Sequence, residues 1–133
     1  MLRKAFTALI GGLTLATVPA QAAQRPSGEA ELARVLQGRV AGEPVDCINL
    51  RTATRSRVIN GTALLYYVGG TVYVNRPRAG ADTLRNWDTQ VTRQFGTSRL
   101  CSIDTVNMVD PISGTLSGIV FLDEFVPYRR VRN

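Results

Sequence analysis

Histidine is absent from the sequence, cysteine occurs only twice, and lysine occurs only once, at Lys4. Without histidine the chain cannot build a Ser–His or Cys–His catalytic couple, a histidine-ligated haem or most zinc sites. It also contains no glycine-rich phosphate-binding loop and no interleaved aromatic and basic residues, so nucleic acid is not expected as a partner. These absences predict no metal site and no cofactor, and they leave carboxylates as the main residues for acid–base chemistry.

The remaining composition is typical of a globular domain. The chain has 133 residues, of which 44% are hydrophobic and 20% are charged, with 16 basic and 10 acidic side chains. A chain of this length has enough apolar residues for one hydrophobic core. We therefore expect a single folded domain rather than a disordered chain.

The first 22 residues are typical of an export signal. Two basic residues precede an uncharged apolar run over residues 5–18, and Ala20-Gln21-Ala22 is a small-x-small cleavage pattern. We expect cleavage between Ala22 and Ala23, which leaves 111 residues, lowers the net charge from +6 to +4 and places the protein in the periplasm or outside the cell. The alternative is a transmembrane anchor or a buried helix. The run is short for a membrane span, and Gly11, Gly12 and Pro19 weaken such a helix, so no anchor is expected in the mature chain.

A short helix is predicted near the start of the mature chain, over residues 29–37. Apolar residues recur there at the spacing of one helix face, at Leu32, Val35 and Leu36. Ser27 can cap the beginning of this helix, and Gly38 can end it. We expect a flexible leader over residues 23–28, one globular domain over residues 29–128 and a basic tail over residues 129–133.

Beyond Pro44 the sequence changes to short β-rich runs separated by turn residues. The candidate strands cover residues 45–50, 57–59, 63–68, 71–75, 105–109 and 115–122. Asn60-Gly61, Gly69-Gly70 and residues 110–114 predict the turns between them. The expected fold is mainly β (α+β), with the short helix followed by a small antiparallel β barrel or sandwich of about six strands.

Residues 82–95 fit two different structures. Leu84, Trp87, Val91 and Phe95 have the spacing of a helical stripe. The same residues also fit a loop or helical turn around residues 84–87, followed by a strand that turns at residues 96–98 into residues 99–104. We favour the second interpretation, because the threonines around Val91 suit a strand.

Cys47 and Cys101 are interpreted first as a disulfide, because an exported protein folds in an oxidising compartment. The bond would close a loop of about 55 residues and stabilise the domain by about 4 kcal/mol. Two free buried thiols and a redox-active pair are the alternatives. A redox-active pair is disfavoured because the chain has neither a C-x-x-C spacing nor a lysine or histidine near either cysteine.

The arginines are concentrated in the middle of the chain. Residues 51–99 contain eight arginines and two aspartates, whereas residues 100–128 contain four acids and no base. In an extended strand Arg51, Arg55 and Arg57 would share one face, because side chains alternate with period 2. Guanidinium groups suit phosphate, sulfate or carboxylate, so these three residues form a candidate anion-binding face. The alternative is a solvated surface in a chain that uses arginine in place of lysine.

Two carboxylates lie close in sequence to the cysteines. Asp46 precedes Cys47, and Asp104 follows Cys101 by three residues. If the disulfide forms, the two strands are neighbours, and a glycosidase-like carboxylate pair becomes a candidate catalytic site. The alternative is that both aspartates form turns or strand-edge ion pairs.

Four segments carry a resemblance that covers about residues 32–128: Leu36-x-Gly38-Arg39-x-Ala41-Gly42-x-Pro44-Val45-x-Cys47-Ile48, Tyr73-x-Asn75-Arg76, Arg99-Leu100-Cys101-x-x-Asp104 and Phe125-Val126-Pro127-Tyr128. In these segments the chain resembles a family of small exported proteobacterial proteins of unknown function. Members of that family often carry two further cysteines, at positions that are Ala81 and Val120 here. The resemblance therefore implies that one bridge has been lost and that Cys47 and Cys101 form the other. It implies no catalytic residue.

The sequence leaves three functions open. The first is a non-catalytic, disulfide-stapled β module that binds an unknown partner or stabilises the cell envelope. The second is a hydrolase that uses Asp46 and Asp104. The third is a binder of envelope polyanions that uses its arginines.

Overall fold

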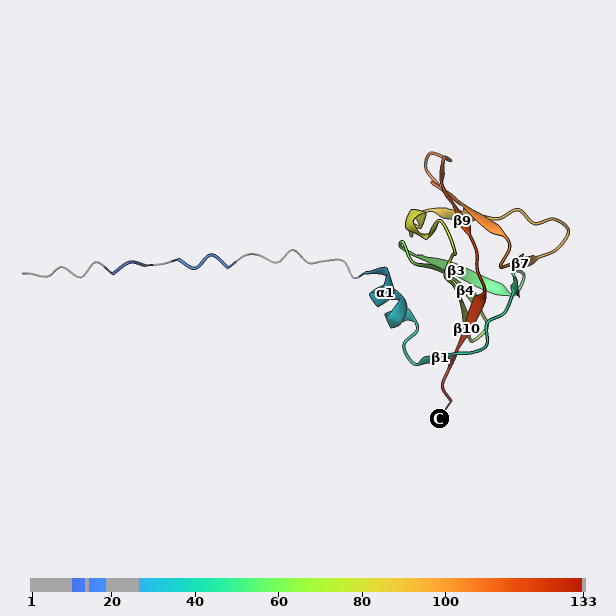
Figure 1. The fold of residues 1–133 in the computed structure, drawn as a ribbon, viewed down its shortest axis with the longest axis horizontal. Coiled ribbons are helices and arrows are strands. Elements are labelled where there is room, and N and C mark those ends of the chain that lie inside the picture. Colours follow the sequence, from blue (N-terminus) through green and yellow to red (C-terminus); the bar gives the residue numbers. More distant parts are fainter. Residues whose placement is uncertain (1–10, 14, 19–26, 133) are drawn as a thin grey trace, which may run out of the picture.

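The computed structural model describes residues 11–13, 15–18 and 27–132. Figure 1 shows a β-rich body with helix α1 (Gly28–Val35) on one side. The predicted cleavage point between Ala22 and Ala23 lies outside the described residues, as does most of the leader expected over residues 23–28. In the described part of the chain, no helix is long and apolar enough to span a membrane.

Helix α1 begins where its cap predicts and ends earlier than expected, at Val35. The Ser27 hydroxyl oxygen accepts a hydrogen bond from the backbone N–H of Ala30 at 3.2 Å, which confirms the predicted N-cap. Gly28 belongs to the helix rather than to the leader. It lies so close to the turn at residues 60–62 that a Cβ there would be 2.6 Å from the backbone oxygen of Asn60. The helix therefore packs tightly against this turn.

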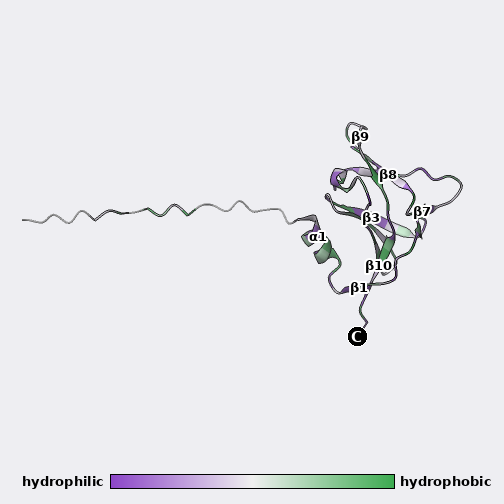
Figure 2. Ribbon diagram, in the orientation of Figure 1, coloured by the Kyte–Doolittle hydropathy of each residue, from purple (hydrophilic) through white to green (hydrophobic). Residues whose placement is uncertain are grey.

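The largest sheet has five antiparallel strands in the order β1-β10-β5-β4-β3. These strands are β1 (Arg39–Ala41), β3 (Ala53–Ile59), β4 (Ala63–Val68), β5 (Thr71–Asn75) and β10 (Phe125–Arg130). Strands β4 and β5 span the predicted residues, and the Asn60-Gly61 and Gly69-Gly70 turns connect β3, β4 and β5 as expected. Edge strand β3 begins four residues before the predicted strand, and its exposed residues 54–57 are hydrophilic (Figure 2). Such residues discourage pairing with another chain.

Strands β1 and β10 were not expected, and β10 corrects the basic tail predicted from residue 129. Arg129 pairs with Thr71 and Arg130 with Arg39, so both arginines belong to the sheet. Pro127 explains the error, because a proline argues against an inner strand. Here the Pro127 carbonyl accepts a hydrogen bond from Gly42 N at 2.7 Å, on the side of β10 where β1 has ended. The missing N–H of Pro127 therefore interrupts no strand pairing.

Two smaller antiparallel sheets pack on the other side of the large sheet from α1. One pairs β2 (Cys47–Asn49) with β7 (Arg99–Cys101), and the other has the order β6-β8-β9, with β6 (Thr89–Val91), β8 (Thr105–Val109) and β9 (Leu116–Phe121). The predicted turn at residues 110–114 joins β8 and β9. Ten strands are thus described, more than the six expected.

Residues 82–95 adopt the favoured arrangement of a helical turn followed by a strand. A 3-10 helix, η1, covers Ala81–Thr83, and β6 follows after five residues. Leu84 is buried, whereas Trp87, Val91 and Phe95 are exposed, so these residues do not form the buried face of a helix. One detail differs from the expectation, because β6 pairs with β8 rather than turning into β7.

The core has two parts, one on each face of the large sheet. On the α1 side, Leu32 packs with Ile59, Leu65 and other residues of β3–β5. On the opposite face, Leu64 and Tyr66 of β4 pack against the smaller sheets. Strand β4 is therefore buried on both faces, as its continuous apolar run predicts.

One buried polar residue ties the two halves of the chain together. Asn75 is completely buried at the end of β5, where its side-chain amide donates to the backbone oxygen of Asp123 at 2.6 Å. The Asn75 amide oxygen in turn accepts from the backbone N–H of Asp123 at 3.2 Å. This pair of hydrogen bonds holds the segment between β9 and β10 against the sheet.

The fold is therefore mainly β and antiparallel with one short helix, as predicted. Among the described residues the three sheets are open, with no closed barrel, and the arrangement of layers fits a sandwich.

Candidate functional site

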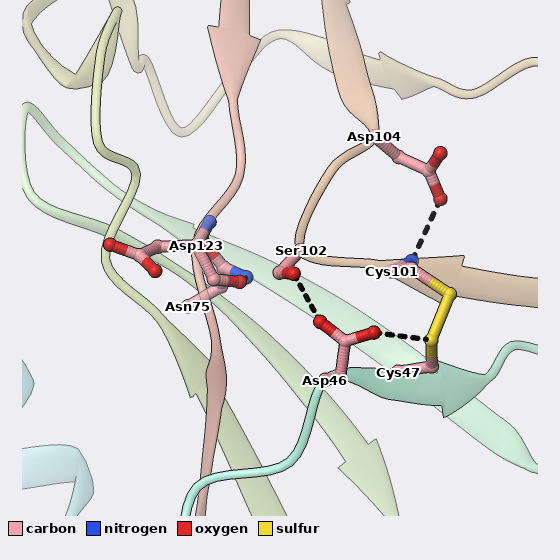
Figure 3. The surroundings of a disulfide bond; sticks show 7 residues. All are labelled: Asp46, Cys47, Asn75, Cys101, Ser102, Asp104 and Asp123. Atoms are coloured by element: carbon pink, nitrogen blue, oxygen red, sulfur yellow. Dashed lines mark hydrogen bonds between the residues drawn. A yellow bond between two sulfur atoms is a disulfide. The ribbon is translucent and has the colours of Figure 1, made fainter.

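Cys47 and Cys101 form a disulfide, which confirms the first interpretation of the two cysteines. They lie directly opposite each other in the β2–β7 pair, with their sulfurs 2.07 Å apart and their Cα atoms 4.0 Å apart (Figure 3). Neither cysteine is a free thiol. The bond therefore fixes the register of two short strands that are far apart in sequence.

Asp46 interacts locally with the segment that follows Cys101. Its side chain accepts a hydrogen bond from the Ser102 hydroxyl, and its backbone oxygen accepts from Ser102 N at 2.8 Å. The other carboxylate oxygen lies 3.4 Å from Cys47 Sγ. A disulfide sulfur has no proton to donate, so we regard this as a van der Waals contact rather than a hydrogen bond.

Asp104 closes the turn that leaves β7. Its carboxylate accepts from Cys101 N at 2.8 Å, and its backbone N–H donates to Cys101 O at 3.0 Å. The two predicted candidates thus lie beside different cysteines, Asp46 next to Cys47 and Asp104 next to Cys101, each with hydrogen bonds to nearby residues (Figure 3). Asp104 borders a cavity of about 220 Å³, and Asp46 does not line it. This geometry gives the hydrolase hypothesis no support.

A group of potential metal ligands also lies at the disulfide. In the described part of the chain, Asp46, Cys47 and Cys101 are the three acidic or cysteine residues whose ligand atoms lie within 4.8 Å of one another. Cysteine binds metals as a thiolate, and both sulfurs here are bonded to each other. The oxidised protein therefore offers a single carboxylate at this place.

The three arginines proposed as an anion face lie in three different environments. Arg55 stacks on the Tyr67 ring, with its guanidinium carbon 4.0 Å from the ring centroid. Arg57 pairs with Glu31 of α1 at 2.6 Å. Arg51 lies before β3, and an irregularity in the β3–β4 pairing separates it from the other two. Strand alternation alone therefore does not place all three arginines on one face.

Arg51 instead shares a cavity with Arg99. The cavity has a volume of about 650 Å³ and is open to solvent. Its other lining residues are Leu50 and four residues of the β6–β7 loop, namely Gln94, Gly96, Thr97 and Ser98. A hydrogen bond of 2.8 Å from Leu50 N to Ser98 O holds the two walls together. Both arginines are exposed, and neither forms an ion pair with a described residue.

The partnership of Arg51 and Arg99 was not predicted, although the sequence holds a signal for it. Cys47 pairs with Cys101, and the antiparallel register places Asn49 opposite Arg99. Continuing the same register brings Arg51, two residues beyond Asn49, toward the segment before Arg99. If the two cysteines are assumed to lie opposite each other on antiparallel strands, the disulfide therefore predicts that Arg51 and Arg99 are neighbours.

Helix α1 neutralises two other arginines. Glu29 pairs with Arg76 at 2.5 Å, and this hydrogen-bonded pair lowers the pKa of Glu29 and raises that of Arg76. With the Arg57–Glu31 pair, two arginines of the basic middle segment are engaged. Arg51 and Arg99 are not among the arginines that α1 neutralises.

Two further groups have shifted pKa values for structural reasons. The backbone N–H groups of Ser113 and Ile112 donate to the Asp110 carboxylate and lower its pKa. Burial raises the pKa of Tyr66, whose hydroxyl donates to the Gln90 side chain at 2.8 Å. The first group stabilises the β8–β9 turn, and the second lies in the core.

Comparison with known proteins gives no match to a family model, a curated protein or a solved structure. Any function is therefore inferred from this chain's own residues.

Proposed function

We propose that the protein is an exported, non-catalytic β module that binds an anionic polymer of the cell envelope in the cavity between Arg51 and Arg99. Export is supported by the charge and hydropathy pattern of residues 1–22. The disulfide is consistent with folding in an oxidising compartment. The resemblance to small exported proteobacterial proteins agrees with this localisation, and it suggests no activity.

One observation carries the binding proposal: two arginines without ion-pair partners among the described residues line one open cavity. A guanidinium group can donate two parallel hydrogen bonds to a phosphate, sulfate or carboxylate. The hydroxyls of Thr97 and Ser98 line the same cavity and can donate further hydrogen bonds. The cavity thus combines positive charge with neutral donors.

A polymer suits this cavity better than a small enclosed anion. The cavity is open to solvent, so a bound monovalent ion would stay hydrated, and its attraction to exposed arginines would be weak. A chain of repeated anionic groups can contact both arginines at once, and the second contact is then intramolecular. We therefore expect tight binding only for polyanions.

The test is titration calorimetry with inorganic polyphosphate at low salt, with inorganic phosphate as the single-unit comparison. We expect polyphosphate to bind the wild-type protein. Each of the single variants Arg51→Gln and Arg99→Gln should lose about fivefold in affinity. Arg34→Gln is the matched control, because it removes the same charge from the exposed surface of α1. Equal losses of affinity in all three variants would show that binding depends only on the net charge of the protein, which would contradict the proposed site.

A further inference from the structure

Asp88 is a buried carboxylate whose charge has no partner among the described residues. Asp88 as a whole is 7% exposed, and each of its carboxylate oxygens has less than 1 Å² accessible to solvent. Neither oxygen accepts a hydrogen bond from a described residue. Removing such a group from water without hydrogen bonds costs stability. An unpaired buried carboxylate of this kind needs an explanation, and a donor or a cation that binds beside it supplies one.

Asp88 also lines a cavity of about 460 Å³ between helix α1, strand β3 and the start of β6. Arg57 and Glu31 line the same cavity and are paired with each other at 2.6 Å. The charges of this pair cancel. The lining of the cavity therefore carries one net negative charge, that of the Asp88 carboxylate. The remaining polar walls come from Ser56, Asn86, Thr89 and Gln90.

We propose that this cavity binds a small organic monocation, a compound with a primary ammonium or guanidinium group that donates its hydrogen bonds to Asp88. The volume lies within the range of small-molecule sites and is far larger than a metal ion needs. A single charge matches the net charge of the cavity, and the hydroxyl and amide side chains suit the polar remainder of such a compound. The proposal includes a rotation of the Asp88 side chain toward the cavity, because both carboxylate oxygens are closed to solvent in the structure. This site does not depend on Arg51 or Arg99.

The test is an NMR titration of the purified, isotope-labelled protein with butylammonium chloride. We expect saturable shifts of the backbone amides of residues 56–58 and 86–90, and no such shifts with 1-butanol, which has the same shape without the charge. Absence of saturable shifts, or equal shifts with the alcohol, would overturn the proposal. Saturation by calcium chloride in place of butylammonium would also overturn it, because the ligand would then be a metal ion.

Three variants identify the group that binds the cation. Asp88→Asn should weaken butylammonium binding about tenfold or more, because a charge-assisted hydrogen bond is lost. Arg57→Gln should strengthen it, because a positive charge is removed from the cavity wall. Asp82→Asn, which removes an exposed carboxylate outside this cavity, should leave it unchanged. Unchanged binding by Asp88→Asn would refute the assignment.

The same variant separates binding from folding. Because Asp88→Asn removes a buried unpaired charge at nearly constant volume, its melting temperature should rise while its affinity for butylammonium falls. A fall in both would mean that Asp88 has a structural partner, which contradicts the proposal. Butylammonium binding should survive in the Arg51→Gln/Arg99→Gln variant, so failure at one site is distinguishable from failure at the other.

Discussion

Cys101 lies directly across the β2–β7 pair from Cys47, and the bond between them sets the positions of Arg51 and Arg99. Arg99 is two residues from one cysteine and Arg51 is four residues from the other. The two strands contain only three residues each, so few backbone hydrogen bonds hold them together. The disulfide therefore supports both the stability of the domain and the geometry of the proposed anion site.

Replacing both cysteines by serine should destabilise the domain strongly. The sequence separation of the bridge is 54 residues, for which the loss of loop-closure restraint costs about 4 kcal/mol and lowers the melting temperature by roughly 15 °C. Calorimetry of the oxidised protein and of the Cys47→Ser/Cys101→Ser variant measures this difference. A reducing agent should lower the melting temperature of the wild type and leave the variant unchanged. Equal melting curves for wild type and variant would show that the bond does not stabilise the fold.

Asn75→Ala should destabilise the domain by about 2 kcal/mol, because it removes both hydrogen bonds that the buried Asn75 side chain makes with the backbone of Asp123. Chemical denaturation followed by circular dichroism gives the free energy of unfolding. Asn107→Ala is the control, since the half-buried Asn107 side chain makes no hydrogen bond with a described residue. A similar small change in both variants would refute the structural role of Asn75.

The Asp110 turn should weaken in acid. Backbone hydrogen bonds from Ser113 and Ile112 lower the pKa of Asp110 in the folded protein. Its stabilising effect is therefore complete above the ordinary aspartate pKa of about 3.9 and is lost as the pH falls through the lower folded value. The melting temperature of wild type relative to Asp110→Asn should consequently fall between about pH 5 and pH 2. A constant difference across this range would mean that Asp110 does not act through its charge.

Export should be visible in the mass of the protein. Expressed in a bacterium, the chain should appear in the periplasmic fraction without residues 1–22 and with two hydrogens fewer than the dithiol form. Ala22→Leu replaces a small residue of the cleavage pattern and should leave the precursor uncut. A full-length wild-type product confined to the cytoplasm would contradict the export proposal.

The strands that local sequence predicts best are those bounded by turn residues. Strand β4 lies between the Asn60-Gly61 and Gly69-Gly70 turns, β5 begins directly after Gly69-Gly70, and the boundaries of both strands agree with the prediction. Strand β10 was missed because Pro127 argues against a strand, and only the early end of β1 makes that proline acceptable. Tertiary context of this kind is absent from any local pattern.

The candidate site likewise has some features that the sequence predicts and others that depend on tertiary structure. The disulfide follows from the presence of two cysteines in a predicted exported chain, whereas the pairing of arginines depends on distant strands. Arg55 and Arg57 were grouped with Arg51 by alternation, but Tyr67 and Glu31 engage them in the folded protein. Asp88 has no sequence signal, because its isolation is a property of packing.

The most direct test of the central claim is the salt dependence of polyphosphate affinity. For the wild type, affinity should fall steeply between about 50 and 200 mM salt, because each neutralised anionic group releases counterions. The Arg51→Gln/Arg99→Gln variant should bind weakly at low salt. Its plot of log affinity against log salt concentration should be less steep, by the amount expected for about two lost ionic contacts. Coinciding curves for the wild type and the double variant, or an affinity that does not respond to salt, would contradict the account.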